Sequence, residues 1–149
     1  MRRPIVAANW KMFKTVHEAV VYIKELRQLA KDVHDVEIVV APPFTALYAA
    51  CEAARASNIA MAAQDVYVEK EGAFTSAISA GMAREAGAEF AIVGHSERRR
   101  IFHDDDETVN RKARAAVAAE MTPIICIGET LEERERDETM AVLDRQIKA

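Results

Sequence analysis

The sequence has few of the features that mark secreted, membrane-spanning or metal-binding proteins. Its 149 residues include only two cysteines, Cys51 and Cys126, and no C-x-x-C spacing, which argues against a zinc site or a disulfide framework. No apolar run approaches the ~20 residues that a membrane-spanning helix needs. The basic start, residues 1–4, precedes only a short strand-like run, so we expect no signal peptide. These absences favour a protein of the reducing cytoplasm that holds no metal and contacts no membrane.

The sequence also lacks an excess of positive charge and any sign of a boundary between domains. Twenty-four acidic residues against twenty basic ones leave a net charge of −4, which argues against a nucleic-acid partner. The chain contains no G-x-G-x-x-G fingerprint, which counts against dinucleotide binding. It also shows no linker, low-complexity tract or exact repeat, so we interpret residues 1–149 as a single domain.

Short apolar runs alternate with amphipathic stretches along the chain. The apolar runs predict strands at residues 4–8, 36–41, 59–64, 90–93 and 123–127. The amphipathic stretches predict helices at residues 15–31, 44–56, 76–86, 106–120 and 131–148. Continuously apolar strands are typical of a parallel sheet covered on both faces, so the pattern predicts an α/β fold of five βα units.

Several local patterns refine these helices. Thr15 with Glu18, and Thr130 with Glu133, have the spacing of capping boxes. We expect the acidic run 104–107 to be a solvated helix start and the run 132–138 to be a solvated face. The expected buried faces are Ala19, Ile23, Leu26 and Ala30 in the first helix and Met140, Leu143 and Ile147 in the last.

Three predicted strand ends carry more chemical groups than a connecting loop needs. Asn9-Trp10-Lys11 follows the first strand, Gly94-His95-Ser96-Glu97 the fourth, and Cys126-Ile127-Gly128-Glu129 lies at the end of the fifth. Because the carboxyl ends of parallel strands lie at one end of a sheet, we expect these groups to converge.

The groups could serve chemistry or structure. Lys11 can attract a phosphate or an oxyanion, although a lone lysine is usually a surface residue. Asn9 can donate and accept hydrogen bonds or simply form a turn. His95 stands at a helix start, whose positive end favours a neutral imidazole that can still donate a hydrogen bond. Glu97 can pair with Lys11, orient Ser96 or occupy a first helical turn.

Taken together, these segments resemble a known family. The segments that carry the resemblance are Asn9-Trp10-Lys11-Met12, Ala41-Pro42-Pro43-Phe44, Ala63-Gln64-Asp65-Val66-Tyr67, Glu71-Gly72-Ala73-Phe74-Thr75, Val93-Gly94-His95-Ser96-Glu97-Arg98-Arg99 and Cys126-Ile127-Gly128-Glu129. Their order and spacing resemble those of the triosephosphate isomerases over essentially the whole chain. The resemblance implies five of the eight units of a TIM barrel, an incomplete barrel in this chain.

The resemblance also implies a reaction and residue roles. The family interconverts dihydroxyacetone phosphate and glyceraldehyde 3-phosphate through an enediolate, in glycolysis and gluconeogenesis, without cofactor or metal. Asn9 and Lys11 would contact the triose phosphate, with Lys11 stabilising charge, and His95 would be the neutral electrophile. Glu97 would couple to the Lys11 region, Ser96 would steady the catalytic base, and Cys126 would pack beside the site.

A second implication concerns assembly. The segment from Gln64 to Thr75 would project into a neighbouring subunit and bring Thr75 close to that subunit's Asn9 and His95. The resemblance therefore implies a homodimer, whereas composition alone describes an ordinary polar loop.

Two further features of the family have no match among these residues. In the family, a glutamate after the sixth strand is the general base, and later glycine-rich loops grip the phosphate. A complete barrel of this class needs ~250 residues. We therefore expect residues 1–149 alone to have negligible isomerase activity and to leave both sheet edges open. Two alternatives stay open: a non-catalytic assembly module that pairs through those edges, and an unrelated doubly wound sheet with a ligand at a switch point.

Overall fold

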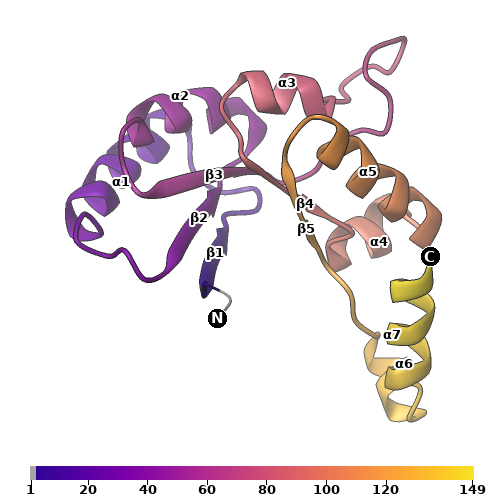
Figure 1. The fold of residues 1–149 in the computed structure, drawn as a ribbon. Helices are drawn as coiled ribbons and strands as arrows, with labels where there is room; N and C mark the ends of the chain where they lie inside the picture. Colours follow the sequence, from indigo (N-terminus) through magenta and orange to yellow (C-terminus); the bar gives the residue numbers. More distant parts are fainter. Residues whose placement is uncertain (1–2) are drawn as a thin grey trace.

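The computed structural model describes residues 3–149, so the first two residues of the basic start lie outside the described part. Its strands are β1 (Ile5–Asn9), β2 (Glu37–Ala41), β3 (Ile59–Ala63), β4 (Phe90–Val93) and β5 (Thr122–Ile125). They form one parallel sheet in the order β1-β2-β3-β4-β5. The sheet curls into part of a barrel (Figure 1). Sequential order leaves no switch point, so the doubly wound alternative is wrong.

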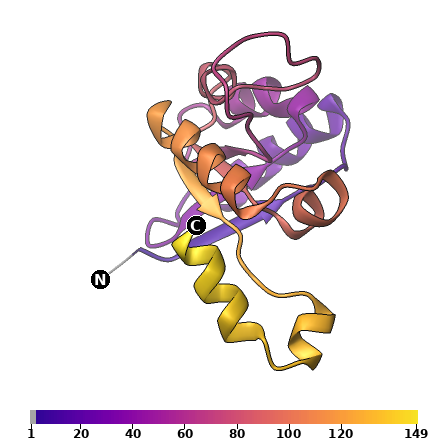
Figure 2. The ribbon, with the colours of Figure 1, turned by 90° about the vertical axis from the view of Figure 1, so that its right-hand side faces the viewer.

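The helices are α1 (Val16–Leu29), α2 (Phe44–Ala54), α3 (Ala80–Glu85), α4 (Ser96–Phe102), α5 (Asp106–Ala118), α6 (Leu131–Glu135) and α7 (Thr139–Lys148). Helices α1, α2, α3 and α5 lie along the outer side of the curled sheet (Figure 1). The α6–α7 pair extends away from the rest of the body (Figure 2). Within residues 3–149, no helix is both long and apolar enough to cross a membrane.

Alternate residues of the central strands build two apolar clusters. Val40, Met61 and Val93 belong to the larger cluster, which includes buried residues of α1, α2, α3 and α5. Val39 and Ile92 belong to a smaller cluster made of strand residues from the opposite side of the sheet. Because side chains alternate between the two faces of a strand, the continuously apolar runs supply both clusters. The curled sheet thus buries its inner face largely against itself rather than under a second helical layer.

The two edge strands are more exposed, as expected. Ile5 and Val6 of β1 have 52% and 60% of their surface exposed, and Ile125 of β5 has 51%. Both strands pair on one side only within the described sheet. An unpaired parallel edge with apolar side chains is a template for association with another chain.

The expected capping boxes are confirmed at the starts of α1 and α6. The Thr15 and Thr130 hydroxyls accept the backbone N–H of Glu18 and Glu133, and each glutamate carboxylate accepts the N–H of its threonine. Of the expected buried face of α1, Ala19, Ile23 and Ala30 are buried and Leu26 is half-buried.

The connections after β3 and β4 differ from the predictions. The helix expected at 76–86 spans only Ala80–Glu85, because Ser76 has a φ of 72° and Ser79 is the residue that caps the helix. The sequence pattern also missed α4 as a separate element. His103 ends it with a left-handed φ of 59°, and Asp105 then caps the start of α5.

The predicted last helix, 131–148, is wrong because the chain breaks into two helices. Asp137 has a φ of 58° between α6 and α7, so the helical phase restarts. Of the three residues expected to be buried, Met140 and Ile147 are exposed, at 75% and 70%, and Leu143 is half-buried. Val142 is the buried residue of α7 instead, at 2%.

The acidic run before α5 is not uniformly solvated. Asp105 caps α5 by accepting the N–H of Thr108, as a helix start predicts. Asp104 is buried and accepts hydrogen bonds from Lys112 at 2.6 Å and Arg98 at 3.2 Å. The solvated interpretation was wrong for Asp104, because the cations that pair with it come from elements on either side.

Candidate functional site

The ends of β1 and β4 meet through one ion pair. The Lys11 ammonium donates to Glu97 Oε1 at 2.9 Å, and both side chains are partly exposed. Strands β2 and β3 lie between β1 and β4 in the sheet, so this contact depends on the curl. The expected convergence of these strand ends is therefore present.

The Lys11 backbone is held from two sides. Its φ is 53°, and its N–H donates to the Asn9 side-chain oxygen at 2.9 Å. The Gln64 side-chain amide donates to the Lys11 carbonyl at 2.9 Å and to the Ala41 carbonyl at 2.8 Å. Gln64 thus joins the ends of β1 and β2 within its own chain, a role that its place at a strand end hinted at but that the sequence analysis missed.

The contacts of His95 indicate how its ring is protonated. The residue caps α4, and its Nδ1 accepts the backbone N–H of Glu97 at 3.2 Å. An accepting Nδ1 carries a lone pair, so the proton of the neutral ring sits on Nε2. The Glu97 carboxylate lies 3.5 Å from Nδ1, beyond a good hydrogen bond. His95 can therefore donate from Nε2 to a carbonyl oxygen while remaining uncharged.

Glu97 is the partner that keeps Lys11 in place. The hydrogen bond from Lys11 lowers the pKa of the Glu97 carboxyl, and the positive charge of Lys11 lowers it further. The ionised carboxylate is consequently the form that the folded chain favours. It holds a fixed cation next to a neutral hydrogen-bond donor, which suits stabilisation of negative charge on an oxygen.

We expect the Lys11→Met variant to raise the pKa of Glu97 toward its ordinary value of about 4.5. Because the folded-state pKa is the lower one, the pair contributes stability above about pH 4.5 and loses it as the pH falls through the lowered pKa. Carboxyl chemical shifts during an NMR pH titration measure this change. Lys24→Met, an exposed lysine of α1, is the control and should leave Glu97 unmoved. An unchanged pKa in Lys11→Met would contradict the pairing.

Arg99 ties three parts of the site together, and the sequence analysis assigned it no role. Its guanidinium donates to the Gly94 carbonyl at 2.9 Å, to Asp106 Oδ1 at 2.6 Å and to the Cys126 carbonyl at 3.3 Å. It thereby connects the ends of β4 and β5 with the start of α5. Cys126 is half-buried against the smaller apolar cluster, and burial raises the pKa of its thiol.

Ser96 and Thr75 have no contact that tests their expected roles. Ser96 is exposed, and its hydroxyl makes no hydrogen bond within residues 3–149. Thr75 is exposed on the loop between β3 and α3, which projects from the body (Figure 1). The Tyr67 and Phe74 rings, 4.7 Å apart, pack this loop on itself. Contact of Thr75 with a neighbouring molecule stays a prediction.

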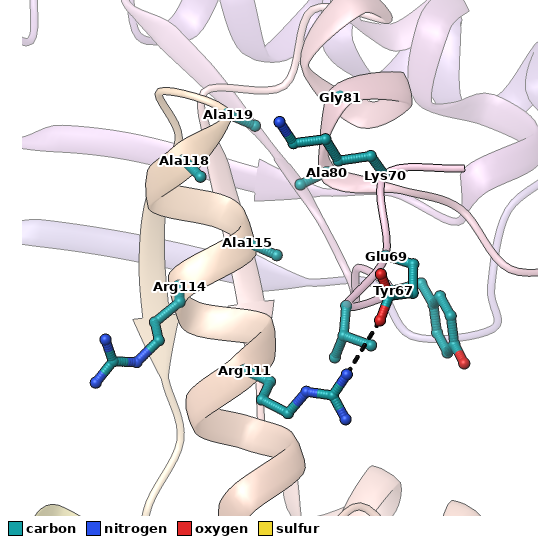
Figure 3. Close-up of a pocket in the computed structure, with 11 residues that line it drawn as sticks. Tyr67, Glu69, Lys70, Ala80, Gly81, Arg111, Arg114, Ala115, Ala118 and Ala119 are labelled. Atoms are coloured by element: carbon teal, nitrogen blue, oxygen red, sulfur yellow. Dashed lines mark hydrogen bonds and ion pairs between the residues drawn. The ribbon is translucent and has the colours of Figure 1, made fainter. Parts of the chain in front are cut away.

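Two cavities adjoin these elements. One of about 740 Å³ lies beside the site, between Ser96-Glu97 and the segment 128–133. The other, of about 500 Å³, lies between α3 and α5 over small side chains and beside an Arg111–Glu69 ion pair of 3.1 Å (Figure 3). Within residues 3–149, no group of three His, Cys, Asp or Glu side chains could hold a metal ion.

Comparison with known proteins gives one consistent result. The family model described as triosephosphate isomerase matches residues 4–149. The triosephosphate isomerases of Geobacter metallireducens and Citrifermentans bemidjiense are 53% and 52% identical to this chain, over 99% of it and 59% of their own length. The crystal structure of the Bartonella henselae triosephosphate isomerase superposes with a TM-score of 0.94 at 36% identity, over 99% of this chain and 61% of that one.

The residues that the comparisons match include the curled sheet and the strand ends that form the candidate site. The chain spans about 59% of the length of the curated relatives that it matches. The solved relative reproduces the curled five-stranded arrangement across nearly the whole chain. The family model likewise covers all three strand ends that form the site. The chain therefore belongs to the triosephosphate isomerase family.

Proposed function

We propose that residues 1–149 carry the electrophilic and electrostatic half of a triose phosphate isomerase site. The observation that carries this proposal is the convergence of Lys11, Glu97 and His95 from strand ends that the curled sheet brings together. The substrate is dihydroxyacetone phosphate or glyceraldehyde 3-phosphate, and Asn9 and Lys11 contact it. The reaction takes place in the cytoplasm, where thiols such as Cys51 and Cys126 stay reduced.

The chemical step moves a proton between two adjacent carbons of the substrate. A base removes a proton from one carbon, and the electrons shift to the neighbouring carbonyl oxygen to form an enediolate. The neutral His95 ring donates from Nε2 to that oxygen and then moves protons between the two oxygens. Lys11, positioned by Glu97, stabilises the negative charge. No glutamate of residues 1–149 occupies the position of the base.

Because these residues supply no general base, the proposal can be tested directly. We expect purified residues 1–149 to show negligible turnover of glyceraldehyde 3-phosphate. Mixing them with the remaining C-terminal βα units of the Geobacter metallireducens enzyme should restore measurable activity. In that mixture, His95→Gln should lower kcat by about 10²–10⁴-fold. His17→Gln, at an exposed position of α1, should not. Full activity of residues 1–149 alone would contradict the proposed division of the site.

A second candidate is a non-catalytic assembly module, favoured by the exposed apolar side chains of β1 and β5. Here the open edges, or the loop from Gln64 to Thr75, hold a homodimer or larger oligomer together. The loop version also brings Thr75 to the partner's Asn9 and His95. Sedimentation of the complemented and uncomplemented chain separates the two candidates. A stable oligomer that never gains turnover supports the module, whereas recovered turnover that depends on His95 supports the isomerase.

A further inference from the structure

A polar pocket lies at the end of the sheet opposite the candidate site. It has a volume of about 440 Å³, and its walls come from the end of α1 and the two connections that follow α1 and α2. His34 precedes β2 and Asn58 directly precedes β3, whereas Lys11 and His95 follow β1 and β4. In a parallel sheet these are opposite ends, so the pocket is separate from the isomerase site.

The lining of the pocket contains basic side chains and no carboxylate. Arg27, Lys31 and His34 line it, and no Asp or Glu is among its lining residues. Arg3 adds a further cation nearby, because its guanidinium donates to the carbonyls of His34 and Val36 at 3.3 and 3.1 Å. This concentration of basic groups stands out in a chain whose net charge is −4.

Side chains at the pocket engage some of the carbonyls at the helix ends that flank it. Asn58 donates to the carbonyls of Ala30 and Val33 at 2.7 and 2.6 Å, and the Ser57 hydroxyl donates to the Ala54 carbonyl at 2.6 Å. Unpaired carbonyls at a helix end would repel an anion. These side chains engage those carbonyls and so reduce the repulsion.

The basic side chains themselves are available. Among the described residues, Arg27 makes only one long hydrogen bond, to the Ala53 carbonyl at 3.5 Å. Lys31 and the His34 ring have no hydrogen-bond or ion-pair partner within residues 3–149. Arginine offers a planar fork and lysine a mobile ammonium, the two groups that most often hold phosphate oxygens.

We propose that this pocket binds a small anion that carries two or more phosphate groups. One phosphate meets the Arg27 guanidinium, and a second lies within reach of Lys31 and His34. The pocket volume falls in the range of ordinary small-ligand sites. Binding here stabilises the native chain, because the groups of the pocket come from segments that only folding brings together.

Pyrophosphate titration of the full 149-residue chain tests this proposal by calorimetry and by amide NMR shifts. The double variant Arg27→Gln/Lys31→Gln should weaken binding at least 10-fold. Arg84→Gln/Lys148→Gln makes the same change in net charge at exposed positions elsewhere and should leave affinity within 2-fold. Lys11→Gln should also leave it unchanged, which separates this pocket from the candidate isomerase site. Circular dichroism checks that each variant is folded.

Several results would overturn the proposal. Equal weakening in both double variants would mean general charge attraction, as would equal shifts in sodium chloride of matched ionic strength. Amide shifts centred on Lys11 and Glu97 would assign pyrophosphate to the isomerase site.

Arg27→Lys should keep more affinity than Arg27→Gln, and inorganic phosphate should bind more weakly than pyrophosphate. Identical affinities in either comparison would contradict a pocket that holds two phosphates.

Discussion

Replacing Lys112 with methionine should lower the free energy of unfolding by about 3–5 kcal/mol. Its ammonium is nearly fully buried and lies 2.9 Å from both oxygens of Asp65 and 2.6 Å from Asp104. Burial raises the pKa of Asp65, so this carboxyl depends on its ion pairs with Lys112 and Arg98 to stay ionised. The variant leaves the buried Asp104 and the half-buried Asp65 carboxylates with one cation, Arg98.

Urea denaturation measures this loss against a neighbouring control. Arg111→Met removes an ion pair with Glu69 from the same helix, but both side chains are about half exposed, so its cost should stay below about 1 kcal/mol. Adding Asp104→Asn to Lys112→Met should recover part of the stability, because one uncompensated charge disappears. Loss of the unfolding transition in Lys112→Met alone would fit the expectation, whereas equal costs for the two methionine variants would contradict it.

Gly94→Ala should destabilise the fold by about 3 kcal/mol. Gly94 has a φ of 70°, and an added Cβ would lie 2.8 Å from Val109 Cγ1 and 3.1 Å from Arg99 Nη2. The substitution therefore adds backbone strain to a clash against α5. Since His95 is the next residue and Arg99 holds the Gly94 carbonyl, activity in the complemented enzyme should fall as well.

A matched glycine and a double variant make this prediction specific. Gly81 lies in the first turn of α3 with no atom closer than 3.9 Å to an added Cβ. Gly81→Ala should therefore be neutral or stabilise the chain by up to about 1 kcal/mol. Val109→Ala removes the two nearest atoms that the new Cβ meets, so Gly94→Ala should cost less in that background. Additive costs in the double variant would rule out the clash as the cause.

Much of the fold was predictable because strands and helix starts follow local rules. The run Phe90–Val93 is continuously apolar and became β4 with those bounds. Thr15 and Thr130 capped their helices with the glutamate three residues on, as expected. Both patterns depend on neighbours within one turn or one strand, so the sequence alone carries them.

The predictions that failed share a different cause. Asp137 breaks the last helix with a left-handed φ, although its sequence neighbourhood is charged and suits a helix. Once the phase restarts, Val142 rather than Met140 faces the body. Likewise, Asp104 is buried only because Lys112 and Arg98 pack around it. Such outcomes depend on long-range packing, which overrides local patterns.

The sequence by itself determined the five βα units, the family and the strand ends that carry chemistry, because apolar periodicity and motif order are properties of the chain. It did not determine which groups meet. Only the curl of the sheet brings Lys11 across β2 and β3 to Glu97, and only the folded chain places the Gln64 amide against the ends of β1 and β2. Hydrogen bonds and ion pairs act over about 3 Å, and tertiary structure alone sets distances of that order between residues so far apart in sequence.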